Sequence, residues 1–123
     1  METMSPLKKK PKTTKQSSAS DAYVARVFRP AHHHSVYVVY LRNPRGDGKA
    51  GYYVGMTGLS PAQRFENHKK GIKCARVVKR CGERLVPRLY EHLNPMPFQK
   101  AKLMEGLLAD SLRKRGFVVF GGH

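Results

Sequence analysis

The segment from Gly51 to Gly71, GYYVGMTGLSPAQRFENHKKG, constrains the fold most, because it joins a strand pattern directly to a capped helix. Its first residues place two tyrosines and a valine between glycines, which is typical of a strand. Ser60 then stands at an N-cap position, Pro61 at the first helical position and Gln63 at the third, which is a capping box. The closing glycine suits a left-handed C-cap. We therefore expect a strand, a turn and a helix in immediate succession.

The rest of the chain contains comparable patterns. SVYVVYL, Ser35–Leu41, is a second strand pattern, and the turn-rich loop NPRGDGKAG indicates that it pairs antiparallel with the strand that begins at Gly51. Pro87 indicates that a short strand near it lies at a sheet edge. The remaining expected elements are a helix at about Cys74–Arg80, that short strand at about Arg84–Tyr90, a long helix at Phe98–Arg115 and a final short strand at Phe117–Phe120.

Glu105 stands out within the long helix. Helical spacing predicts one apolar face, and at about 100° per residue Glu105 falls at the border of that face. A carboxylate in such a place is partly desolvated and needs a cation, either an arginine or a metal ion; alternatively its side chain turns to water. The residues expected on the apolar face are Leu103, Met104, Leu107, Leu108 and Leu112.

The charge of the chain indicates a polyanionic partner. The net charge is +16, from 24 Lys and Arg against 8 Asp and Glu. Nucleic acid is the first candidate, because each neutralised phosphate releases counterions. Residues 1–22 are rich in Lys, Ser, Thr and Pro, so we expect a largely disordered basic tail over residues 1–34, in which Tyr23–Phe28 either forms a short strand or packs onto the domain. Residues 35–123 form the expected folded domain, which keeps 17 Lys and Arg against 6 Asp and Glu.

A basic run follows the first helix. Between Lys69 and Arg88 there are eight cations and a single acidic residue, Glu83. A stripe that follows a phosphate backbone and an ordinary solvated face both fit this pattern, and the charge surplus favours the stripe. The candidate nucleic-acid-binding residues are Lys69, Lys70, Lys73, Arg76, Lys79, Arg80 and Arg84.

Several short motifs follow one another in a characteristic order: VYVVYL, YYVGMT, RFENH, a later Glu and GFVVFGG. This order resembles the GIY-YIG nuclease superfamily over most of residues 36–122. The resemblance implies an α+β fold, with a small three-stranded antiparallel sheet flanked by helices. It implies catalytic roles for a tyrosine on each of the first two strands, for an arginine and a histidine on the following helix, and for a metal-binding glutamate on a later helix. The matching residues are Tyr37, Tyr53, Arg64, His68 and Glu105.

The implied reaction is hydrolysis of a phosphodiester bond in DNA with Mg²⁺ or Mn²⁺. Such hard cations bind through one carboxylate plus water and phosphate oxygens, so Glu105 suffices as the protein ligand. The metal and Arg64 would neutralise developing charge. Tyr37, supported by His68 or Tyr53, would position or deprotonate the attacking water. Since an unperturbed tyrosine has a pKa of about 10, we expect the site to lower the pKa of Tyr37.

The sequence departs from the family pattern in several places. Ser35 replaces the first glycine of the first motif and Val54 the isoleucine of the second, and no asparagine follows Glu105. Strand alternation places Tyr40 opposite to Tyr37, and Tyr52 opposite to Tyr53, without showing which of each pair faces the site.

A catalytically inactive nucleic-acid-binding module or subunit is the alternative function. Specificity would come from this domain, the tail, a dimer or a protein partner. No run of 18 apolar residues and no apolar signal core is present, so we expect a cytoplasmic protein, nucleoid-associated if prokaryotic.

Overall fold

The computed structural model describes residues 32–122. The expected basic tail and the strand expected at Tyr23–Phe28 lie outside the described residues, apart from positions 32–34. His34 already pairs with Met96 in an isolated antiparallel bridge. The described helices and strands are β1 (Ser35–Leu41), β2 (Gly51–Thr57), α2 (Pro61–Lys70), α3 (Arg76–Cys81), β3 (Gly82–Leu85), the 3₁₀ turns η1 (Pro87–Leu89) and η2 (Glu91–Leu93), α4 (Phe98–Lys114) and β4 (Val118–Gly121).

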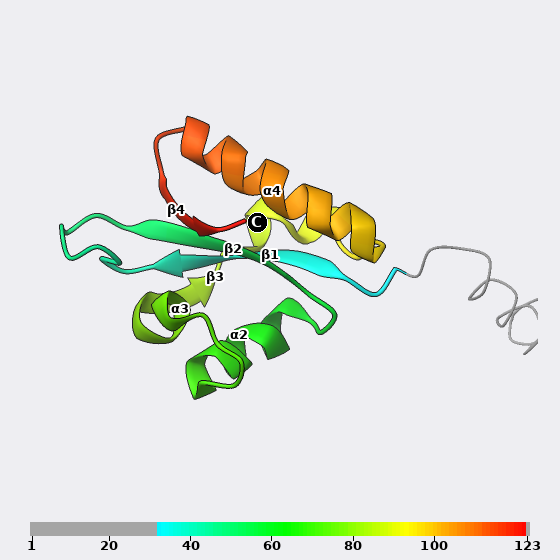
Figure 1. Ribbon diagram of the computed structural model, residues 1–123, viewed down its shortest axis with the longest axis horizontal. Helices are drawn as coiled ribbons and strands as arrows, with labels where there is room; N and C mark the ends of the chain where they lie inside the picture. Colours follow the sequence, from blue (N-terminus) through cyan, green and yellow to red (C-terminus); the bar gives the residue numbers. More distant parts are fainter. Residues whose placement is uncertain (1–31, 123) are drawn as a thin grey trace, which may run out of the picture. The chain divides into compact units, whose positions relative to one another are not determined.

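The sheet has four strands in the order β3-β1-β2-β4. β1 pairs antiparallel with both β2 and β3, whereas β4 pairs parallel with β2. The fold is therefore α+β, as expected, but the expectation of a three-stranded, wholly antiparallel sheet was wrong. The parallel strand arises because α4 crosses over one face of the sheet and returns the chain beside β2 in the same direction (Figure 1).

The strand–helix segment forms as its capping residues predict. The Ser60 hydroxyl accepts the backbone N–H of Gln63 at 3.1 Å, and Pro61 opens α2. Gly71 ends the helix with a φ of 84°, the left-handed conformation in which a side chain would be strained. The capping box is incomplete, however: between these two described residues only the Ser60 hydroxyl bond forms, and the Gln63 Nε2 donates to the Asn67 side-chain oxygen at 3.0 Å.

The segment after α3 differs from the expected strand at Arg84–Tyr90. β3 ends at Leu85, and Pro87 begins a 3₁₀ turn, since proline fixes φ and cannot donate to a ladder. β3 nevertheless lies at an edge of the sheet, as Pro87 indicated.

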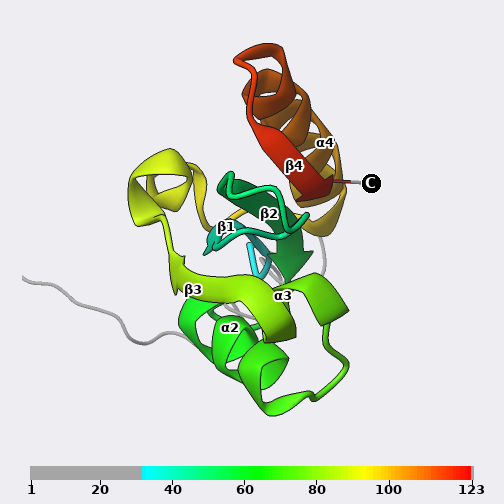
Figure 2. The same ribbon diagram turned by 90° about the vertical axis from the view of Figure 1, so that its left-hand side faces the viewer.

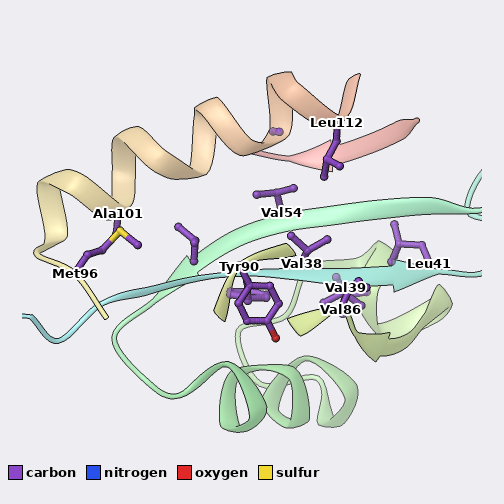
Figure 3. Close-up of a cluster of buried hydrophobic side chains, with 13 residues drawn as sticks. Val38, Val39, Leu41, Val54, Val86, Tyr90, Met96, Ala101 and Leu112 are labelled. Atoms are coloured by element: carbon purple, nitrogen blue, oxygen red, sulfur yellow. The ribbon is translucent and has the colours of Figure 1, made fainter. Parts of the chain in front are cut away.

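The two faces of the sheet are covered by different helices. α4 lies on one face, and α2 and α3 lie on the other (Figures 1 and 2). The core between them is built from β-branched strand residues such as Val38, Val39 and Val54, together with Leu112 from α4 (Figure 3). No helix within residues 32–122 combines the length and the hydropathy that a membrane span requires.

The buried face of α4 overlaps only in part with the one expected from leucine spacing: Leu112 is buried, and Met104 and Leu108 are half-buried against the core. Leu103 and Leu107 are 63% and 52% exposed, whereas Ala101, Glu105 and Ala109 are buried. Small residues occupy this face of α4 because the C-terminal backbone passes close to the helix. A Cβ added at Gly122 would lie only 2.2 Å from the Cβ of Ala109. Glu105 thus lies at the centre of the buried face rather than at its border.

Candidate active site

Tyr37 and His68 form a buried hydrogen bond between β1 and α2. The Tyr37 hydroxyl lies 2.8 Å from Nε2 of His68. Both residues are buried, with exposed fractions of 1% for Tyr37 and 0% for His68. Nδ1 of His68 accepts the backbone N–H of Ala75 at 3.0 Å. Because Nδ1 must be unprotonated to accept that bond, the network assigns the proton of the neutral ring to Nε2. His68 therefore donates to Tyr37, whose own hydroxyl proton stays available for another acceptor.

The protonation state of His68 follows from its surroundings. Burial, and then the nearby Arg64 cation, lower the pKa of His68 from 6.5 to about 4. Both causes disfavour the imidazolium form. His68 is thus neutral at pH 7, with Nδ1 bonded to Ala75 and Nε2 carrying its proton. It can orient and polarise Tyr37, but it has no free lone pair with which to act as a base.

Tyr53 joins these two side chains from β2. Its ring lies 6.2 Å from that of Tyr37 and meets the His68 ring edge-on at 5.6 Å. The intervening space exists because Gly55 is the direct cross-strand partner of Tyr37. A Cβ at Gly55 would lie 2.6 Å from Oη of Tyr37 and 2.7 Å from Cζ. Glycine is therefore required for the Tyr37 ring to lie over β2.

Arg64 is fixed by the loop that follows α2. Its guanidinium donates to the carbonyls of Ile72 at 3.3 Å and of Lys73 at 2.8 Å. The same loop supplies the Ala75 N–H to His68, so one short segment holds both helix residues. Lys73 adopts a φ of 46°, an uncommon conformation for a residue with a side chain. This loop thus has a positioning role that the sequence pattern did not indicate.

Glu105 approaches the same group from α4. It is 9% exposed, and its charge is close enough to raise the pKa of both Tyr37 and Tyr53. The Arg64 charge acts on the same two hydroxyls in the opposite direction. The structure therefore brings together all five side chains that the resemblance singled out, from β1, β2, α2 and α4.

The expected lowering of the Tyr37 pKa is not found. Burial is the largest influence and raises this pKa, Tyr53 raises it further, and the opposing effect of Arg64 is smaller. The pKa of Tyr53 is also raised, first by burial and then by Glu105. Tyr37 is accordingly a neutral phenol at pH 7 and acts as a hydrogen-bond donor rather than as a base in this arrangement.

The oxygen atoms at the site suit a hard divalent cation. One buried carboxylate, Glu105, lies near two phenolic hydroxyls, and Mg²⁺ or Mn²⁺ commonly uses one or two carboxylates with water and phosphate completing the shell. Within residues 32–122, no group of three or more His, Cys, Asp and Glu side chains is placed to enclose a metal ion. The donor set therefore fits an open site of the Mg²⁺ type and does not resemble a closed zinc site.

The candidate nucleic-acid-binding residues divide into two groups. Arg76, Lys79 and Arg80, with Cys74, line a hollow of about 460 Å³ beside α3. Arg80 also donates to the Pro44 carbonyl at 3.3 Å, and the side chains of Lys69, Lys70 and Arg84 make contacts within the domain. Lys69 donates to the carbonyls of Val78, Lys79 and Gly82, Lys70 pairs with Glu66, and Arg84 lies over the ring of Tyr40.

The structure also separates the two pairs of tyrosines. Tyr37 and Tyr53 meet His68, whereas Tyr40 and Tyr52 contact each other edge-on across β1 and β2. Strand alternation puts the second pair on the other face of the sheet.

Comparison with protein-family models, curated proteins and solved structures found no match to this chain. Any function proposed for it therefore depends on the residues and geometry described above.

Proposed function

We propose that this chain is a divalent-metal-dependent endonuclease that hydrolyses phosphodiester bonds in DNA through a GIY-YIG-like site. The observation that carries the proposal is the convergence of Arg64 and Glu105, on different helices, upon the hydroxyls of Tyr37 and Tyr53. A guanidinium and a buried carboxylate beside oriented hydroxyls can neutralise a phosphate and hold a hard cation at one place.

Each side chain has a role that its contacts support. Arg64, held by the Ile72 and Lys73 carbonyls, stabilises charge that develops on the phosphate oxygens. Tyr37 accepts from His68 and directs its own proton to a water or a phosphate oxygen. Glu105 would hold Mg²⁺ or Mn²⁺, and this metal, when bound, supplies further charge neutralisation.

The hollow beside α3 supports a nucleic-acid substrate. Arg76, Lys79 and Arg80 surround it, and residues 35–123 carry 17 Lys and Arg against 6 Asp and Glu. Cys74, which also lines the hollow, belongs to the loop that holds Arg64 and His68. A phosphate in the hollow would thus bind next to the segment that orders the candidate catalytic residues.

The alternative function is a nucleic-acid-binding module without catalytic activity. The positive charge of the domain alone would be sufficient for such binding. The distinguishing experiment incubates the purified protein with duplex, branched and single-stranded DNA in Mg²⁺ or Mn²⁺, with EDTA as control. The proposal expects cleavage that EDTA stops and that Arg64→Ala removes while DNA binding persists. Tight binding without any metal-dependent product on all three substrates would establish the binding module instead.

A further inference from the structure

A row of aromatic side chains crosses the sheet on the face opposite to Tyr37 and Tyr53. Tyr40 on β1 contacts Tyr52, its cross-strand partner on β2, with ring centroids 6.3 Å apart. Tyr52 in turn contacts Phe117, which immediately precedes β4, at 5.2 Å. Both contacts are edge-to-face, the arrangement that aromatic quadrupoles favour. These three residues, Tyr40, Tyr52 and Phe117, are called the aromatic row below.

An arginine lies over a ring at each end of the aromatic row. The Arg84 guanidinium is 4.3 Å from the Tyr40 ring centroid, and that of Arg115 is 5.5 Å from the Phe117 centroid. Glu83 approaches Arg84 at 3.7 Å and partly offsets its charge. Arg115 makes no ion pair within residues 32–122. Glu83 also pairs with Arg42, so each end of the aromatic row keeps a net positive charge.

The aromatic row is open to solvent as well as packed on the core. Phe117 is 40% exposed, the two tyrosines are half-buried, and the arginine side chains extend into solvent. Arginines that lie over aromatic rings can also stack on a further planar group. A planar partner that carries negative charge would complement both properties of this surface.

We propose that the aromatic row and its two arginines bind unpaired bases of a single-stranded nucleic acid. Bases stack on aromatic rings and guanidinium planes whatever their identity, and the arginine N–H groups can reach the adjoining phosphates. A duplex does not fit, because its bases are already stacked on one another. This inference goes beyond the proposed nuclease reaction: the tyrosines of the surface point away from Tyr37 and Tyr53, and the surface contains none of the five candidate catalytic residues. Together the two sites would favour substrates in which a duplex adjoins unpaired nucleotides.

The test uses the full chain in EDTA, so that binding is measured without cleavage. The probes are a ten-nucleotide thymidine oligomer and an abasic deoxyribose-phosphate oligomer with the same number of phosphates. The chain lacks tryptophan, so Phe117→Trp introduces a single indole whose emission reports stacking at this position. We expect the thymidine oligomer to quench that emission and to bind at least about fivefold more tightly than the abasic oligomer, which corresponds to about 1 kcal/mol for one stacked base.

Two variants and one matched control test the residues involved. Phe117→Leu keeps an apolar side chain without a π face, and Arg115→Lys keeps the charge without the plane; each should bring the affinity for thymidine close to that for the abasic oligomer. Phe98→Leu is the control, because Phe98 is 47% exposed at the start of α4 and lies outside the aromatic row. It should keep the preference.

The results distinguish this inference from the proposed function. Equal affinity of the wild type for both oligomers would overturn the inference, as would equal losses in Phe117→Leu and Phe98→Leu. If Phe117→Leu fails to fold, judged by circular dichroism, Arg115→Lys decides the question instead. Metal-dependent cleavage of DNA is measured separately and depends on Glu105 and Arg64, so either claim can fail while the other stands.

Discussion

The buried His68 makes a quantitative prediction for stability against pH. Its pKa is 6.5 in the unfolded chain and about 4 in the folded domain. Between these values the unfolded state binds more protons than the folded state, so the free energy of unfolding rises with pH from 4 to 6.5 and is lost as the pH falls through that window. A shift of this size amounts to about 2 kcal/mol of lost stability between pH 8 and pH 5.

The perturbation that isolates this effect is His68→Gln. Glutamine can donate to the Tyr37 hydroxyl and accept from the Ala75 N–H as neutral histidine does, but it does not titrate. Urea unfolding at pH 8, 7, 6 and 5, followed by far-ultraviolet circular dichroism, gives the unfolding free energy of both proteins. The difference between the two profiles should change by about 2 kcal/mol over this range, since all other titrations cancel. Parallel profiles, within about 0.5 kcal/mol, would refute a buried neutral His68.

Three further substitutions have defined outcomes. Gly55→Ala should lower the unfolding free energy by about 1–3 kcal/mol in urea titrations, because the new Cβ overlaps the Tyr37 hydroxyl; an unchanged midpoint would contradict the packing described. Arg64→Lys should slow single-turnover DNA cleavage by about 100-fold, because a single ammonium cannot reproduce the planar guanidinium; wild-type rates would remove Arg64 from the site. Leu103→Ala and Leu107→Ala should each change the unfolding free energy by less than about 0.5 kcal/mol, whereas losses of about 2–5 kcal/mol would restore the leucine face expected from the sequence.

Local signals in the sequence were sufficient for the elements around the site. The hairpin of β1 and β2 and the capped helix α2 form where strand patterns, Ser60, Pro61 and Gly71 predicted them. These features depend on neighbouring residues, so sequence spacing captures them. The direction of β4 could not be predicted in this way, because it depends on the path that α4 takes over the sheet.

The orientation of α4 shows the limit of helical periodicity. Of the four leucines and the methionine expected on the buried face, Leu112 is buried and Met104 and Leu108 are half-buried, but Leu103 and Leu107 are exposed. The alanines and Glu105 are buried instead, where the backbone at Gly122 comes close to the helix. Periodicity records where apolar residues lie on a helix, but it does not record how near the neighbouring chain comes. Likewise, the raised pKa of Tyr37 follows from burial, which the sequence did not reveal.

The most direct test of the proposed metal site compares Glu105→Gln with Glu66→Gln. Glu66 is an exposed residue of α2 that pairs with Lys70, so it controls for the loss of one negative charge. Cleavage of DNA in Mn²⁺ should fall by at least about 100-fold in Glu105→Gln and stay at the wild-type rate in Glu66→Gln, while both variants bind DNA at least as tightly as the wild type. Cleavage that survives Glu105→Gln would contradict a metal-dependent nuclease site at this carboxylate.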